Sequence, residues 1–131
     1  MNEQVLSGFS ENYVSLGTTG IIQLLAGGDE FWNMPSDELE KLGENWLITE
    51  FYFDEDWKSW EMHPNGEEVV YMLSGSMDLI LQKDDVQKTI ELRSKGLVIV
   101  PRGTWHTAKV FEPSNVLVIT LGKETQVRPI N

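Results

Sequence analysis

The sequence contains no cysteine, which excludes a disulfide framework, a thiolate nucleophile and a zinc finger. Basic residues are also scarce, because 10 Lys and Arg stand against 21 Asp and Glu and give a formal net charge of −11. A surface of this charge repels nucleic-acid phosphates and anionic lipid, so we expect neither nucleic acid nor a membrane as a partner. It also repels anionic small molecules unless the binding pocket provides a cation.

Long apolar stretches are missing as well. No segment approaches the roughly 20 apolar residues that a helix needs to cross a bilayer. The N-terminal residues lack the basic stretch and apolar run of a secretory signal, so we expect a cytoplasmic protein. A chain of 131 residues has room for one domain, and folding should bury about two thirds of the surface that the unfolded chain exposes.

The apolar residues recur in short segments bounded by turn signals, which is typical of β-strands. Such strands at close spacing favour a closed sandwich or barrel, so the predicted fold class is all-β. The only predicted helix lies near residues 36–42, where acidic residues follow Pro35 and Gly43 ends the segment. The predicted strands cover residues 14–16, 21–25, 46–53, 59–63, 69–73, 77–81, 86–92, 97–100, 105–111 and 116–121.

Only two histidines occur, and both have neighbours that suit a metal site. Glu61 and His63 are two residues apart, so their side chains share one face of a strand. A turn at residues 64–66 would bring Glu68 back beside them, and His106 follows another turn into a strand. If these strands lie in one barrel, two imidazoles and two carboxylates converge inside it. This donor set suits Fe, Mn, Zn, Co or Ni, and two histidines with one carboxylate are typical of non-haem iron sites.

These residues resemble the two sequence motifs of the cupin superfamily. The first motif reads His-x-His, three or four residues, Glu, six residues and Gly, and the segment EMHPNGEEVVYMLSG matches it at His63, Glu68 and Gly75. The second motif contains Pro-x-Gly-x-x-His, which the segment PRGTWH matches with His106 as its last residue. Two motifs in this order make the resemblance fairly specific.

The resemblance implies a fold, a division of the chain and an oligomeric state. It covers roughly residues 46–121 and implies a double-stranded β-helix, the RmlC-like jelly-roll barrel of the cupins. Residues 1–45 would add short strands and the helix, within a single domain that covers residues 1–131. Small single-domain cupins are commonly homodimers, so we expect a homodimer.

The resemblance makes His63, Glu68 and His106 metal ligands, whereas Glu61 stands in the place of the family's first histidine. If Glu61 is a fourth ligand, the site becomes harder and more anionic, which favours Mn²⁺ or Fe²⁺ and leaves Zn²⁺ and Ni²⁺ as further candidates. If it is not a ligand, it can act as a general acid or base, with a pKa altered by burial and by Glu68. A third interpretation is a site without metal, but uncompensated anionic groups are costly to bury.

Residues that alternate with these ligands should line a mostly apolar cavity that has its polar groups at one end. Three tryptophans, Trp57, Trp60 and Trp105, form either an aromatic wall for a planar ligand or, as we favour, a packed core or a dimer contact. The predicted lining residues are Val70, Met72, Thr104, Ala108 and Val110.

Cupin enzymes include dioxygenases, decarboxylases and isomerases. The resemblance therefore implies a metal-dependent enzyme that acts on a small organic molecule through open coordination positions of the ion. The same fold also hosts ligand-binding and storage proteins, so a non-catalytic protein that binds or senses a small molecule is the alternative.

Overall fold

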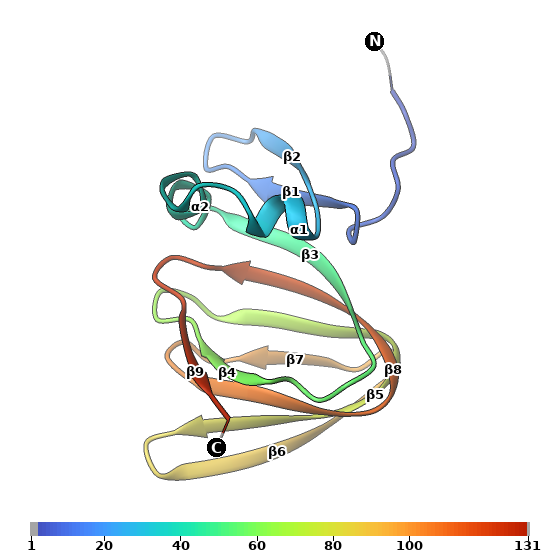
Figure 1. Ribbon diagram of the computed structural model, residues 1–131, viewed down its shortest axis with the longest axis vertical. Coiled ribbons are helices and arrows are strands. Elements are labelled where there is room, and N and C mark those ends of the chain that lie inside the picture. Colours follow the sequence, from blue (N-terminus) through green and yellow to red (C-terminus); the bar gives the residue numbers. More distant parts are fainter. Residues whose placement is uncertain (1–2, 131) are drawn as a thin grey trace.

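The computed structural model describes residues 3–130 as a rolled antiparallel β-structure with two short helices near its N-terminal end (Figure 1). Positions 1, 2 and 131, which the single-domain prediction includes, lie outside the described residues. The helices are α1 (Asp29–Trp32) and α2 (Ser36–Leu42). The strands are β1 (Asn12–Leu16), β2 (Ile22–Ala26), β3 (Trp46–Phe53), β4 (Ser59–Met62), β5 (Glu68–Lys83), β6 (Val86–Arg93), β7 (Leu97–Val100), β8 (Trp105–Leu121) and β9 (Gln126–Pro129).

The structure confirms the all-β fold class and the short helix predicted near residues 36–42. Helix α2 follows Pro35 and ends at Gly43, and Asp37 and Glu38 lie in its first turn, where the free amide groups carry partial positive charge. The sequence does not predict α1, because a helix of one turn is too short to show a periodic pattern. Within residues 3–130, no helix is long and apolar enough to cross a membrane.

Two long strands, β5 and β8, hold the barrel together. They pair antiparallel along nearly their whole length, from Glu68 opposite Thr120 to Gln82 opposite Trp105. Strand β8 also pairs with β3 through its second half and with β4 near its start, while β5 pairs with β6 and β7. Each long strand therefore contributes to two sides of the rolled sheet.

The sequence predicts two separate strands in each of these regions, and this prediction is wrong. The polar residues near Gly75 form a bulge that bends β5 and does not end it, since the pairing register shifts three times between Met72 and Met77. Gly75 has a φ of 112°, which favours glycine, and a Cβ there would collide with Ser114 Oγ and the carbonyl oxygen of Pro113.

The bulge also changes which residues of β5 face the core. Before it, even-numbered positions such as Val70 and Met72 are buried, and after it odd-numbered positions such as Met77 and Leu79 are buried. Side chains alternate along a strand, so the extra residue that the bulge inserts lets the apolar side chains of β5 face the core both before and after the bulge. The complete core cluster is Val70, Met72, Met77, Leu79, Leu81, Leu92, Val100, Ala108, Val116 and Val118.

Further strands extend the sheet at its two ends. Strands β1 and β2 continue it beyond β3, and Figure 1 shows them with α1 and α2 above the stacked barrel strands. Strand β9, which the sequence does not predict, pairs with β4 over residues 59–62. Its four residues are largely exposed, so its strand structure depends on that pairing and not on an apolar pattern.

Candidate metal centre

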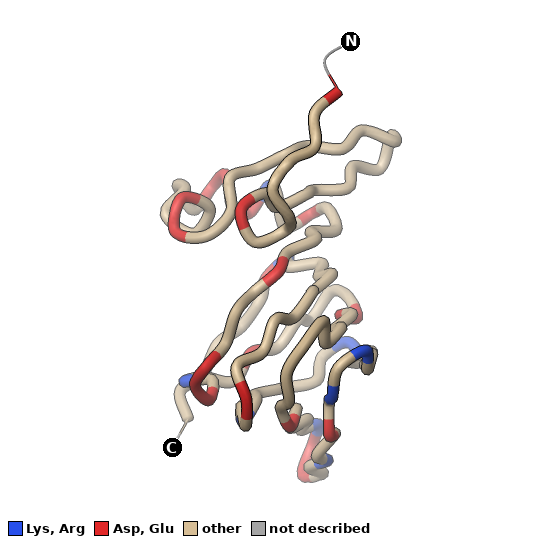
Figure 2. Tube along the Cα trace, turned by 90° about the vertical axis from the view of Figure 1, so that its right-hand side faces the viewer, with Lys and Arg blue, Asp and Glu red and all other residues tan. Residues whose placement is uncertain are grey.

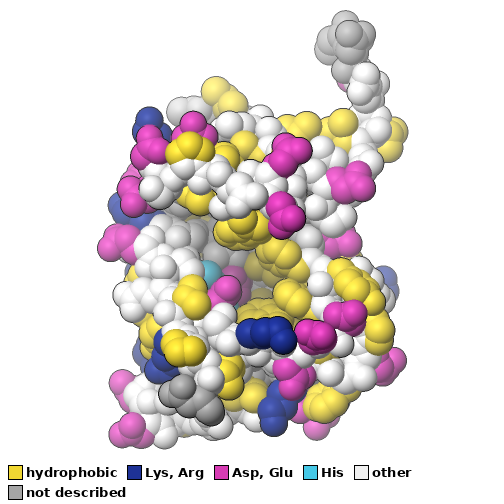
Figure 3. All heavy atoms as spheres, in the orientation of Figure 1, with side chains coloured by type: hydrophobic (Ala, Val, Ile, Leu, Met, Phe, Trp, Pro, Cys, Tyr) yellow, Lys and Arg dark blue, Asp and Glu magenta, His cyan; other side chains and the backbone are white. Residues whose placement is uncertain are grey.

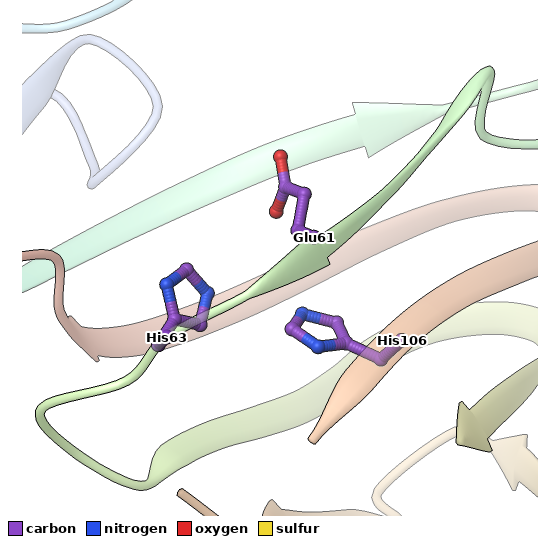
Figure 4. A group of neighbouring side chains, drawn as sticks. All are labelled: Glu61, His63 and His106. Atoms are coloured by element: carbon purple, nitrogen blue, oxygen red, sulfur yellow. The ribbon is translucent and has the colours of Figure 1, made fainter. Parts of the chain in front are cut away.

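The structure brings together all four residues that the sequence predicts as metal ligands. Glu61 lies in β4 and His63 follows that strand, while Glu68 begins β5 and His106 is the second residue of β8. Glu61 lies directly opposite His106 in the β4–β8 ladder, so the two side chains occupy the same face. Figure 4 shows Glu61 and His63 on one chain segment and His106 on the strand across from it.

Glu68 lies between the two imidazoles. Its Oε2 is 3.0 Å from His63 Nε2, and its Oε1 is 3.2 Å from His106 Nε2. Glu61 completes the group, since one donor atom from each of Glu61, His63 and His106 lies within 4.8 Å of the others. Neighbouring donors around a six-coordinate ion with bonds of ~2.1 Å are ~3 Å apart. The spacing of these atoms therefore suits a single small ion.

The other nitrogen of each imidazole is held by a partner that determines where its proton lies. His106 Nδ1 is 3.2 Å from the carbonyl oxygen of Thr104, which can only accept, so Nδ1 carries hydrogen. Thr125 Oγ1 donates to the carbonyl of Gly122 at 2.8 Å and lies 2.8 Å from His63 Nδ1, so it accepts the proton of that nitrogen. Both Nε2 atoms therefore face the cluster, and each offers a lone pair to a metal ion when it carries no proton.

The two Nε2 atoms are buried, and in the described chain, residues 3–130, neither has a hydrogen-bond partner. The Glu68 oxygens lie 3.0 and 3.2 Å from them, as ion-pair contacts when the imidazoles are protonated. A buried polar atom without a partner is costly, and a metal ion at the centre of the cluster would satisfy both nitrogens at once. The residues present therefore fit a metal ion.

Burial and mutual charge alter the pKa values of the cluster. Burial raises the pKa of Glu61, although the imidazole of His106 opposes this effect. Burial also acts to raise the pKa of Glu68, but His106 and His63 outweigh it and lower that pKa to about 2. For His106, burial acts to lower the pKa, and the Glu68 carboxylate reverses this and raises it. In the absence of metal, the Glu68 carboxylate thus favours the protonated form of His106, and a metal ion that binds there competes with that proton.

Three supporting residues hold the ligands in place. Thr120 Oγ1 donates to Glu68 Oε2 at 2.6 Å, and the backbone N–H of Gly103 donates to the carbonyl of His63 at 3.0 Å. Gly103, with a φ of 74°, belongs to the second motif, so this bond ties the two motif turns together. The sequence misses Thr120 and Thr125, because each approaches its partner only through pairing of strands distant along the chain.

A cavity of about 660 Å³ opens onto the cluster. Figure 3 shows this hollow between the N-terminal elements and the barrel, with a histidine side chain visible in its depth. Its polar end contains Glu61, His63 and Glu68, together with Thr120 and Thr125. Its walls come mainly from α1, α2, β3 and the segment after β3, and include Phe31, Trp32, Leu39, Leu42, Phe51 and Trp57. The prediction of a mostly apolar cavity is thus confirmed, whereas its polar groups are not confined to one end, since Asp54, Glu55, Asp56 and Lys58 also line it.

The residues that the sequence predicts to line this cavity do not line it. Val70, Met72 and Ala108 belong to the hydrophobic core, Val110 packs against that core, and Thr104 is buried beside His106. The prediction fails because the inner face of the barrel is filled by packed side chains. The cavity lies at one end of the barrel, where residues before position 60 form most of its walls.

The three tryptophans have two different roles. Trp57 packs against the hydrophobic core, as favoured, and also lines the cavity, with its ring centroid 6.0 Å from that of His106. Trp60 and Trp105 lie on either side of the Arg128 guanidinium, at 5.2 and 4.4 Å from ring centroid to Cζ. These cation–π contacts attach β9 to the barrel.

No family model matches the sequence, and no curated protein matches it. Among solved structures, a cupin-2 domain containing protein from Shewanella frigidimarina is similar, with a TM-score of 0.50 and 13% identity over 71% of this chain and 98% of that one. The coconut allergen cocosin has a TM-score of 0.54 and 18% identity over 72% of this chain and 25% of its own. Bacillus subtilis oxalate decarboxylase, which has Mn(II) centres, has a TM-score of 0.54 and 18% identity over 69% of this chain and 25% of its own.

Proposed function

Starting from a chain with the cupin fold, we propose that this protein binds one divalent metal ion through His63, Glu68 and His106, with Glu61 as a fourth ligand. The observation that carries the proposal is the convergence of donor atoms: those of Glu61, His63 and His106 lie within 4.8 Å of one another, and the Glu68 oxygens lie 3.0 and 3.2 Å from the two buried Nε2 atoms. Two carboxylates and two imidazoles form a hard, anionic donor set. This set favours Mn²⁺ or Fe²⁺, with Zn²⁺ and Ni²⁺ as weaker candidates.

We further propose that the protein is a metal-dependent enzyme of the dioxygenase, decarboxylase or isomerase type. The bound ion would supply Lewis-acid or redox chemistry to a small organic molecule in the cavity. Glu61 lines the cavity, and burial raises its pKa, so a Glu61 side chain that is not a ligand can take a proton from that molecule and return it. Phe51 and Trp57 add apolar surface to the cavity wall against which such a molecule can pack.

The experiment that tests metal binding is elemental analysis of untagged protein that is purified without chelator from cells supplied with Mn²⁺ and Fe²⁺. We expect about one equivalent of metal in the natural protein and a large loss in His106→Ala and Glu68→Gln. Glu67→Gln is the matched control, because this exposed neighbour of Glu68 lies outside the cluster and its loss should leave the metal content unchanged. Metal-free natural protein, or unchanged metal content in both ligand variants, would contradict the proposal.

A second candidate function is the binding or sensing of a small molecule without turnover. The observation that favours it is the size and apolar character of the cavity walls, which suit tight retention of a ligand. Tight ligand binding together with no turnover across a substrate panel, by metal-loaded protein, would select this candidate over the enzyme.

We also propose a homodimer in which β2 contributes to the interface. In the described residues β2 pairs only with β1, so its other edge offers free backbone groups, and Ile22 and Leu24 on it are 64% and 49% exposed. Light scattering at micromolar concentration should give about twice the monomer mass of 15.0 kDa. A monomer at that concentration would contradict this proposal.

A further inference from the structure

The cavity beside the proposed metal centre carries charge of mainly one sign. Among its lining residues, all within the described chain, Lys58 is the only lysine or arginine. Its Nζ lies 3.3 Å from Glu55 Oε2, so its charge is already matched at the rim. The carboxylates along the cavity are Asp54, Glu55, Asp56, Glu61 and Glu68.

A bound metal ion would not outweigh the excess of carboxylates in the cavity. With Glu61 as the proposed fourth ligand, its carboxylate and that of Glu68 together equal the charge of a divalent ion, so a loaded centre offers no net positive charge to an incoming anion. Figure 2 shows acidic residues on both the N-terminal elements and the barrel, in keeping with the net charge of −11. A carboxylate ligand would therefore enter against repulsion from the rim, the walls and the whole surface.

The walls of the cavity are suited to an apolar body. Phe31, Trp32 and Phe51 form a continuous aromatic group, with ring centroids 4.8 Å apart between Phe31 and Trp32 and 6.5 Å apart between Trp32 and Phe51. Trp32 is 54% exposed although it lies against the cavity, so a bound molecule could cover apolar surface that water now contacts. Helix α2 adds Leu39 and Leu42 to the same walls.

From these observations we infer that the cavity selects an uncharged, largely apolar small molecule that directs a hydroxyl or keto oxygen toward the cluster, and that it rejects carboxylates. The orientation of that oxygen rests on the proposed metal function. The preference for an uncharged molecule rests on the walls and rim of the cavity, so it holds with or without metal.

A matched pair of probes, 2-naphthol and 2-naphthoate, tests the inference by isothermal titration at pH 7.5. The two share a ring system and differ mainly in charge. We expect 2-naphthol to bind at least about tenfold more tightly in both chelator-treated and metal-loaded protein, since this is the ratio that a modest repulsion produces. Equal or tighter binding of 2-naphthoate, or no detectable binding of 2-naphthol at millimolar concentration, would overturn the inference.

Two pairs of variants locate the effect. Trp32→Ala should weaken 2-naphthol binding severalfold, whereas Trp46→Ala, which removes a partly exposed tryptophan outside the cavity lining, should leave it unchanged. Glu55→Gln frees Lys58 and should strengthen 2-naphthoate binding, whereas Glu67→Gln should not. If both members of either pair behave alike, the binding lies elsewhere and the inference is overturned.

Metal content measured on the same samples separates the two proposals. Protein that never retains metal but still prefers 2-naphthol would overturn the proposed function and leave the charge preference intact. Protein that holds one metal ion but prefers 2-naphthoate would overturn the inference and leave the metal site intact.

Discussion

Replacing Glu68 with Gln should destabilise the metal-free protein by an amount that depends on pH. The ordinary pKa of this carboxyl is 4.5, and in the folded protein the neighbouring imidazoles lower it to about 2. At about 1.4 kcal/mol per pH unit, the difference corresponds to about 3 kcal/mol of stability. Because the folded pKa is the lower one, this stabilisation is present above pH 4.5 and disappears as the pH falls from about 4.5 to about 2.

The raised pKa of His106 sets the upper end of the pH range in which the Glu68 carboxylate stabilises the fold. Glu68 attracts an imidazole that still carries its proton, so the stabilisation is greatest below the pKa of His106 and declines at higher pH, where that proton leaves. The difference between natural protein and Glu68→Gln should therefore be about 3 kcal/mol near pH 5.5 and should fall to about 1 kcal/mol near pH 2.5. Comparing the two proteins cancels the titration of the carboxylates that do not contact the cluster.

Urea denaturation of chelator-treated protein, followed by tryptophan fluorescence at pH 5.5, 4.5, 3.5 and 2.5, measures this difference. Glu67→Gln serves as the control and should match the natural protein at every pH, because Glu67 is exposed. A difference that stays constant over this range would refute the reasoning. It would mean that Glu68 stabilises the fold by packing and by its bond from Thr120, and not by its charge.

Three further outcomes are expected. Thr125→Val should weaken metal binding by about 10- to 100-fold in calorimetric titration, since His63 loses the acceptor that fixes its tautomer. Thr125→Ser, which keeps the hydroxyl, should retain most of the affinity. An equal loss of affinity in both variants would contradict this role. Metal affinity, measured by competition with a chromogenic chelator, should fall steadily from pH 8 to pH 5.5 because the metal must displace the proton of His106, and a flat profile would disagree. Gly75→Ala should lower the free energy of unfolding, measured by urea denaturation, by about 1–3 kcal/mol, because the residue has a positive φ and its Cβ would collide with Ser114. An unchanged free energy of unfolding would contradict this prediction and show that the bulge adapts to the side chain.

The four residues of the candidate metal centre could be found from the sequence because their placement depends on short-range rules. Glu61 and His63 share a face through strand alternation, and a single turn returns the chain to Glu68. His106 is far from the other three residues along the chain, and the Pro-x-Gly-x-x-His motif that it ends identifies it. Residue types and local spacing thus carry enough information for the ligands, whereas whether they bind metal stays a prediction.

The course of the long strands could not be obtained in this way. Ser74 and Gly75 have the composition of a turn, yet hydrogen bonds from β8 continue past them and keep β5 as one bent strand. Strand β9 and helix α1 are equally inaccessible to pattern analysis, because β9 lacks an apolar pattern and depends on its pairing with β4, and α1 is a single turn without a repeat.

The amino-acid order therefore specifies the all-β class, the helix at 36–42 and the metal-ligand candidates, since each depends on alternation, capping or a motif within a few residues. The cavity walls and the threonines that support the ligands follow from the register of strands far apart along the chain. Phe31 and Trp32 stand opposite the cluster only because β1, β2 and β3 carry α1 to that end of the barrel. Long-range pairing is selected by the packing of the whole core, which no local window of the sequence contains.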